Sequence, residues 1–201
     1  FFVIYLTSFV LWNRKLTNSL VLTARVKRFL AILLVLTFIV IGICLMYEDC
    51  MNKIIFIPLI LTYIISAILE KLLFISFKNR AKQKHRSIAG LRTVAITASF
   101  GKTSIKNFLY HVLKSRFKVY KTPRSVNTIA GLVLDVNRDL PLDTQIYIAE
   151  AGARIKGDIE EIALFLEPQI CVIGSVGEQH IEYFKTLNNI INTKMELLKS
   201  P

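Results

Sequence analysis

The chain has 201 residues, of which 53% are hydrophobic and 20% charged, and its mean hydropathy is +0.50. Hydropathy that high beside so many charges excludes a single soluble domain in which the two kinds of residue are evenly mixed. Residues 1–92 hold 13 Lys and Arg against 3 acids, whereas residues 93–201 hold 13 against 11, so most of the net charge of +12 lies in the first half.

Three apolar runs in the first half predict membrane-spanning helices. Residues 29–47 are 19 uncharged residues, and at a rise of about 1.5 Å per residue they nearly match a hydrocarbon core of about 30 Å. Residues 54–77 predict a second span, with Pro58 in its tolerant first turns. Residues 1–12 are interpreted as the end of an earlier span, and the alternative is a buried helix of a soluble protein.

The charges that flank these runs predict their orientation. The segments before residue 29 and after residue 77 are rich in Lys and Arg, whereas the short segment between the two long runs carries Glu48, Asp49 and Lys53. Basic segments tend to stay in the cytoplasm. Residues 78–92 are therefore predicted to be a basic cytoplasmic linker. Basic residues beside apolar runs also favour a lipid bilayer as the partner, and no nucleic acid is expected.

From residue 93 onward, short β-rich runs alternate with helical stretches. Strands are predicted at residues 93–97, 118–121, 145–150 and 169–174, and helices at residues 102–115, 128–137, 157–165 and 187–199. This alternation predicts an α/β fold, with a parallel sheet and flanking helices. In such folds ligands bind at the carboxyl ends of the strands.

The first predicted strand runs into residues 97–104, Thr-Ala-Ser-Phe-Gly-Lys-Thr-Ser. Gly101 would let backbone N–H groups approach phosphate oxygens, Lys102 would neutralise them and Thr103 could bind Mg²⁺. The strict phosphate-loop pattern is incomplete, because Ile96 stands where its first glycine belongs. A bare Gly-Lys-Thr also occurs by chance.

Two more side chains are predicted at the same edge of the sheet. Glu150 closes the third strand, where a carboxylate could face the Mg²⁺ of a bound phosphate. A solvated rim residue is the alternative interpretation. His180 follows the fourth strand and could reach the same edge, although a lone histidine is usually structural.

Together these motifs resemble the central ATPase domain of the Mur ligases, bacterial enzymes that build the peptide stem of peptidoglycan. The resemblance covers residues 90–200 and is carried, in order, by VAITASFGKTSIK, SVNTIAG, IAEAGARIKGDIEEIALFLEPQICVIGSVGEQHIEYF and NTKMEL. Within the family, the sequence is similar to the MurF type, which adds D-alanyl-D-alanine to UDP-MurNAc-tripeptide. The resemblance implies that residues 93–201 form a truncated P-loop Mur ligase central domain, preceded by an α-helical transmembrane region.

The resemblance also implies roles for individual residues. The ATP-binding residues would be Thr97, Ser99, Gly101, Lys102, Thr103, Ser104 and Asn127. Mg²⁺ would be held by Thr103, Glu150 and His180. The catalytic residues would be Lys102, His180 and Lys194, the last of which is carbamylated in many members.

Two departures from the family pattern stand out. Ala98 occupies a position that is usually glycine, and it would be strained by about 1 kcal/mol or more if that position needs a positive φ. Arg154 and Ile155 stand where many MurF-type enzymes have Asn-His, whereas other members carry an Ala-Arg form like this one.

The expected function is a membrane-anchored, ATP-dependent amide ligase of the bacterial inner membrane, with its ATPase domain in the cytoplasm. Its substrates would be UDP-MurNAc-tripeptide and D-alanyl-D-alanine, joined through an acyl phosphate. The 201 residues alone are expected to be inactive, because the amine-binding domain of the family is missing. The alternatives are another Mur-type ligase, or a membrane scaffold with a non-catalytic nucleotide-binding domain.

Overall fold

The computed structural model describes residues 22–46 and 56–199, and the chain divides into two compact units at Phe74 and Ile75. The first unit contains helix α2 (Ala24–Cys44) and the first part of helix α4 (Ile57–Ser87). The predicted partial span at residues 1–12 lies outside the described residues. Each unit is taken by itself below.

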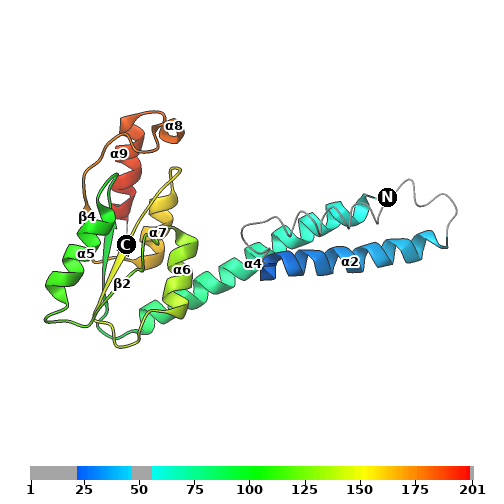
Figure 1. The fold of residues 1–201 in the computed structure, drawn as a ribbon, viewed down its shortest axis with the longest axis horizontal. Helices are drawn as coiled ribbons and strands as arrows, with labels where there is room; N and C mark the ends of the chain where they lie inside the picture. The colour runs from blue at the N-terminus through cyan, green and yellow to red at the C-terminus, as the bar shows by residue number, and fades with distance from the viewer. Residues whose placement is uncertain (1–21, 47–55, 200–201) are drawn as a thin grey trace, which may run out of the picture. The chain divides into compact units, whose positions relative to one another are not determined.

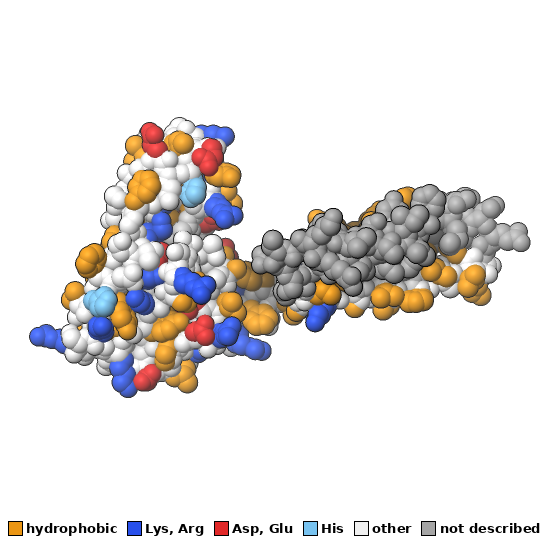
Figure 2. All heavy atoms as spheres, viewed as in Figure 1, with side chains coloured by type: hydrophobic (Ala, Val, Ile, Leu, Met, Phe, Trp, Pro, Cys, Tyr) orange, Lys and Arg blue, Asp and Glu red, His pale blue; other side chains and the backbone are white. Residues whose placement is uncertain are grey.

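Helix α2 has the properties of a membrane-spanning segment. It is 21 residues long and none of its residues is buried, and hydrophobic side chains lie along the part of it that Figure 2 leaves in view. Thr23 begins the helix by accepting a hydrogen bond from the backbone N–H of Val26, as an N-cap threonine does. By length and composition alone, α2 and α4 are both able to cross a bilayer.

Within the first unit, an ion pair joins the two helices. The guanidinium of Arg28 on α2 donates two hydrogen bonds to Oε1 of Glu70 on α4, at 2.9 and 2.6 Å. Both partners are partly buried, and each compensates the charge of the other.

Helix α4 differs from the prediction at its end. The basic segment expected to be a linker, residues 78–92, is helical as far as Ser87. Its Ala81, His85 and Ile88 are buried in the core of the second unit. Along this stretch Lys78 pairs with Glu161, and Lys82 and Arg86 both pair with Glu167.

The second unit has the predicted α/β architecture. Four strands pair in the order β2-β3-β1-β4, and each pairing is parallel. The strands are β1 (Arg92–Thr97), β2 (Val119–Lys121), β3 (Ile146–Glu150) and β4 (Ile170–Ile173). Because all four run in the same direction, the loops that follow them gather at one edge of the sheet.

Helices cover both faces of this sheet (Figure 1). On one face, α5 (Lys102–Leu113) packs over Val94, Ile96 and Ile148. On the other face, the end of α4 packs with α6 (Ile129–Arg138) and α7 (Asp158–Leu166) over Ala95 and Tyr147. Successive strand residues therefore point to opposite faces, as the period of two requires.

The end of the described chain is more broken than predicted. The helix expected at residues 187–199 is α9 (Leu187–Met195) followed by a 3-10 turn, η1 (Glu196–Lys199). A short helix, α8 (Ile181–Phe184), precedes it. In η1, the Glu196 carboxylate accepts hydrogen bonds from the backbone N–H groups of Gly157 and Glu160. It thereby caps the start of α7, where a negative charge is favourable.

Candidate active site

The loop between β1 and α5 is built to present backbone N–H groups. Gly101 precedes α5 with φ 79°, a left-handed conformation that glycine adopts without strain. Ser99 fixes the loop, since its hydroxyl donates to the carbonyl oxygen of Gly177 at 2.9 Å and accepts from the Gly177 N–H at 3.0 Å. The first turn of α5, with Thr103 and Ser104, therefore opens at the carboxyl edge of the sheet.

Ala98 is accommodated in this loop without backbone strain. Among the described non-glycine residues, a positive φ occurs at Arg124, Glu167, His180 and Lys185, and Ala98 is not one of them. Its side chain is fully buried. The space for its methyl group comes from Gly174, where an added Cβ would lie 2.9 Å from the Ala98 Cβ.

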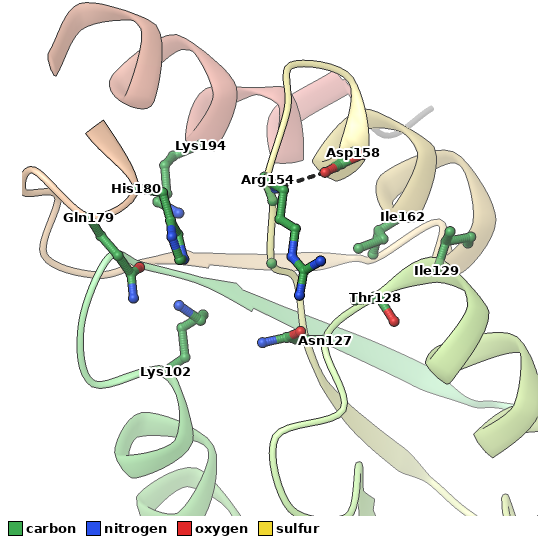
Figure 3. A pocket seen from close by; sticks show the side chains of 12 residues that line it. Lys102, Asn127, Thr128, Ile129, Arg154, Asp158, Ile162, Gln179, His180 and Lys194 are labelled. Carbon is green, nitrogen blue, oxygen red and sulfur yellow. Dashed lines mark hydrogen bonds between the residues drawn. The ribbon is translucent and has the colours of Figure 1, made fainter. Parts of the chain in front are cut away.

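A pocket of about 400 Å³ lies at this edge of the sheet. Its walls come from the start of α5, the loop before α6, the loops after β3 and β4, and helix α9 (Figure 3). The lining residues are Lys102, Asn127, Thr128, Ile129, Gly152, Ala153, Arg154, Asp158, Ile162, Gln179, His180 and Lys194.

The charges that line the pocket are mostly positive. The side chains of Lys102, Arg154 and Lys194 reach into it from three different elements (Figure 3). The one carboxylate in the lining, that of Asp158, accepts hydrogen bonds from the backbone N–H groups of Arg154 and Ile155. Cations that converge from separate elements favour an anionic ligand.

Two of these cations have a lowered pKa. Burial, and next the positive charge of Lys102, lower the pKa of Lys194 to about 8. Burial also lowers the pKa of Lys102, and the charge of Glu150 partly offsets that effect. In this structure Lys102 donates to the carbonyl oxygen of Ala98 at 2.7 Å. An anion between the two ammonium groups would relieve their repulsion.

Glu150 lies at the end of β3, buried beneath the pocket and outside its lining. Its Oε1 is 2.7 Å from Nζ of Lys106, and both side chains are 1% exposed. That approach lacks hydrogen-bond geometry, so Oε1 is a buried oxygen without a hydrogen-bond donor. Thr97 Oγ1, at the end of the neighbouring strand, is also buried and without a hydrogen-bond partner among the described residues.

The Glu150 oxygen suits a cation held chiefly by a bound phosphate. Carboxylate and hydroxyl oxygens are ligands that Mg²⁺ accepts, usually together with substrate phosphates. The described residues contain no group of three or more His, Cys, Asp or Glu side chains able to hold a metal by themselves.

The structure brings together four of the residues implied by the family resemblance, since Lys102, Asn127, His180 and Lys194 line one pocket. Thr97 and Ser99 are buried within the phosphate loop. Sequence reasoning missed Asp158, Gln179 and Lys106. The spacing of Lys106, one helical turn after Lys102, was a signal that could have placed it on the same helix near the site.

Comparison with known proteins identifies the family to which this fold belongs. Residues 96–201 match the model of the Mur ligase middle domain, and the chain belongs to the Mur ligase family. The UDP-N-acetylmuramoyl-tripeptide–D-alanyl-D-alanine ligase of Rickettsia prowazekii is 31% identical over 135 residues, 65% of this chain and 30% of that protein. The enzyme of the same name from Bacillus subtilis is 32% identical over 109 residues, 54% of this chain and 24% of that protein.

Solved structures agree with this assignment. MurF ligase from Thermotoga maritima in complex with ADP is 35% identical, with a TM-score of 0.60 over 63% of this chain and 29% of that chain. MurF from Acinetobacter baumannii shares the fold, with a TM-score of 0.60 at 23% identity over 63% of this chain and 28% of that chain. This chain thus spans less than a third of the length of these relatives.

The pairing of Ala98 with Gly174 gives a testable prediction. Gly174→Ala would place a Cβ 2.9 Å from the Ala98 Cβ and 3.0 Å from Ile105 Cδ1. Overpacking of this kind costs about 1–3 kcal/mol, so we expect a Tm lower by roughly 5 °C or more in circular dichroism. Adding Ala98→Gly removes the closer contact and is expected to restore most of the loss. A double variant no more stable than Gly174→Ala would contradict this account.

Proposed function

We propose that this chain is the membrane-anchored, ATP-binding part of an amide ligase of peptidoglycan precursor synthesis. The observation that carries the proposal is the cationic pocket at the carboxyl edge of the sheet, opening beside the Gly101 loop and lined by Lys102. The similarity to a MurF ligase that was solved with ADP supports a nucleotide as its ligand.

The reaction would be that of the relatives, which are named for joining D-alanyl-D-alanine to UDP-N-acetylmuramoyl-tripeptide. A carboxylate oxygen of the tripeptide would attack the γ-phosphorus of ATP and release ADP. The amine of the dipeptide would then attack the acyl carbon, expel phosphate and lose a proton. The phosphoryl transfer needs positioning and charge neutralisation more than covalent chemistry from the protein.

The residues of this chain would divide that work among them. The N–H groups at the start of α5 and the ammonium of Lys102 would hold the phosphates of the nucleotide. Thr103, Glu150 and His180 would hold Mg²⁺, which neutralises charge on the transferred phosphoryl group when it is bound. Asn127, in the loop before α6, would orient the nucleotide and the acyl substrate from the opposite wall.

Ala98 no longer favours the scaffold alternative. That alternative depended on strain in the phosphate loop, and the backbone at Ala98 has no positive φ. The nucleotide site is therefore proposed to be functional.

The first test is ATP binding by the 201-residue chain in detergent with Mg²⁺, measured by calorimetry. Lys102→Ala removes a charged contact worth about 1.5–3 kcal/mol, so we expect affinity to fall by roughly tenfold to a hundredfold. Lys114→Ala, at the exposed far end of α5, is the matched control and should bind as the wild type does. A folded wild-type chain that binds no ATP would refute the proposal.

Lys194 is proposed to carry a carbamate. The neutral amine would attack CO₂ to form an N–C bond and release one proton, and the resulting anion would lie across the pocket from Lys102. With a pKa of about 8, about a quarter of the Lys194 amine is neutral at pH 7.5, far more than for an ordinary lysine.

Carbamylation of Lys194 should therefore increase as the pH rises through about 8. We expect a carbamate signal in ¹³C NMR of the chain supplied with ¹³C-bicarbonate, stronger at pH 8.5 than at pH 7. The signal should be absent in Lys194→Met and unchanged in Lys199→Met, which removes the exposed lysine of the following turn. No signal at saturating bicarbonate and pH 8.5 would exclude the modification.

Anchoring in the bacterial inner membrane is also a proposal, supported by the length and apolar surface of α2 and α4. The basic segments that flank them favour a cytoplasmic location for the nucleotide-binding unit. We expect the chain to stay in the membrane pellet after alkaline carbonate extraction. Val35→Arg, which places a charge in the middle of α2 at a cost of about 3 kcal/mol, should increase the released fraction. Full release of the wild type would contradict the proposal.

A further inference from the structure

Lys106 is a buried lysine to which the reaction described above gives no role. It lies on α5 one turn after Lys102, but whereas Lys102 lines the pocket, Lys106 points to the sheet and is 1% exposed. Burying an ammonium group is costly unless it is paired and hydrogen-bonded. The contacts of the Lys106 ammonium therefore indicate its structural role.

The ammonium of Lys106 joins three segments of the site. It lies 2.7 Å from Oε1 of Glu150 at the end of β3. It donates hydrogen bonds to the carbonyl oxygens of Thr122, at 2.8 Å, and of Arg124, both in the loop between β2 and α6. Its own backbone belongs to the helix that follows the phosphate loop.

The loop that Lys106 holds is under backbone strain. Arg124 has φ 47°, a left-handed conformation that is unfavourable for a non-glycine residue. Such a conformation persists only where its surroundings enforce it. The hydrogen bond from Lys106 to the Arg124 carbonyl is one such restraint.

Asn127, three residues after Arg124, carries this restraint to the pocket. Its carbonyl oxygen accepts a hydrogen bond from the N–H of Gly152 at 2.8 Å. Its side chain fits against Gly152 so closely that a Cβ on that glycine would lie 2.9 Å from Asn127 Cγ. Gly152 follows Glu150 by two residues, so Lys106 is connected to both walls of the pocket.

We propose that Lys106 is a positioning residue that fixes the Glu150 carboxylate and the loop of residues 122–127 before nucleotide and Mg²⁺ bind. This inference rests on the proposed nucleotide site and adds to it a device for preorganisation. Without Lys106, the buried Glu150 carboxylate loses its countercharge, and the Arg124 carbonyl loses the donor that holds its strained loop.

The test compares Lys106→Met, which keeps the length of the side chain but removes its charge, with the wild-type chain in detergent. Affinity for ATP is measured with Mg²⁺ and with EDTA. We expect the gain in affinity that Mg²⁺ provides to fall at least tenfold, whereas affinity in EDTA, which depends on Lys102 and the phosphate loop, changes less than threefold.

Amide hydrogen exchange without nucleotide supplies a second readout. Exchange at residues 124–128 and at Gly152 is expected to become at least tenfold faster in Lys106→Met. Lys118→Met is the matched control, because Lys118 is exposed and pairs with Asp143 rather than with a pocket segment. It should leave both the Mg²⁺ effect and the exchange of these amides unchanged.

The outcomes separate the two proposals. A variant that is only less stable, with the Mg²⁺ effect and the exchange rates unchanged, would overturn the role of Lys106. Failure of the wild type to bind ATP would refute the nucleotide site, and the exchange experiment would still decide whether Lys106 positions the loop. Should the methionine variant not fold, Lys106→Arg replaces it, and faster exchange at residues 124–128 is expected from its displaced charge.

Discussion

Parallel pairing of β1 with both β3 and β4 is the constraint on which the candidate site depends. In this register Ile96 lies opposite Glu150, and Thr97 lies opposite Ile173. The phosphate loop, the acidic strand end and the loop that carries His180 therefore reach the same edge of the sheet, although they are far apart in the sequence. The helices on the two faces hold the sheet, while residues beyond the strand ends supply the chemistry.

The electrostatics of the site follow from this gathering of loops. The second half of the chain is nearly neutral, with 13 basic and 11 acidic residues, but these charges are unevenly distributed in space. Glu161 and Glu167 neutralise cations on α4, and Glu196 caps α7. Lys102, Arg154 and Lys194 consequently face a pocket whose lining has one carboxylate, that of Asp158, which is engaged by the backbone. The buried Glu150 outside the lining acts on Lys102 alone among these three cations. A modest net charge thus coexists with a strongly cationic cavity.

Local patterns predicted the sheet and the position of the phosphate loop, because strand periodicity and the Gly101 turn depend on residues that are adjacent in the sequence. The helical continuation of α4 to Ser87 could not be read in this way. Its Lys78, Lys82 and Arg86 resemble a solvated linker, because the acids that they pair with, in α7 and directly after it, come about 80 residues later in the sequence. The burial of Lys106 and Lys194 could not be predicted for the same reason, since it results from tertiary packing and no nearby residue indicates it. The role of Lys194 came from family resemblance alone.

The close approach of positions 98 and 174 also limits the order in which substitutions can accumulate. The space beneath the phosphate loop holds the methyl group of Ala98, and the backbone at Gly174 leaves no room for another. Moving that methyl group from one position to the other without a crowded intermediate requires glycine at both positions first. The unusual alanine in this loop is therefore one half of a coupled pair, and an ancestor with glycine at both positions would connect the two arrangements by tolerated single steps.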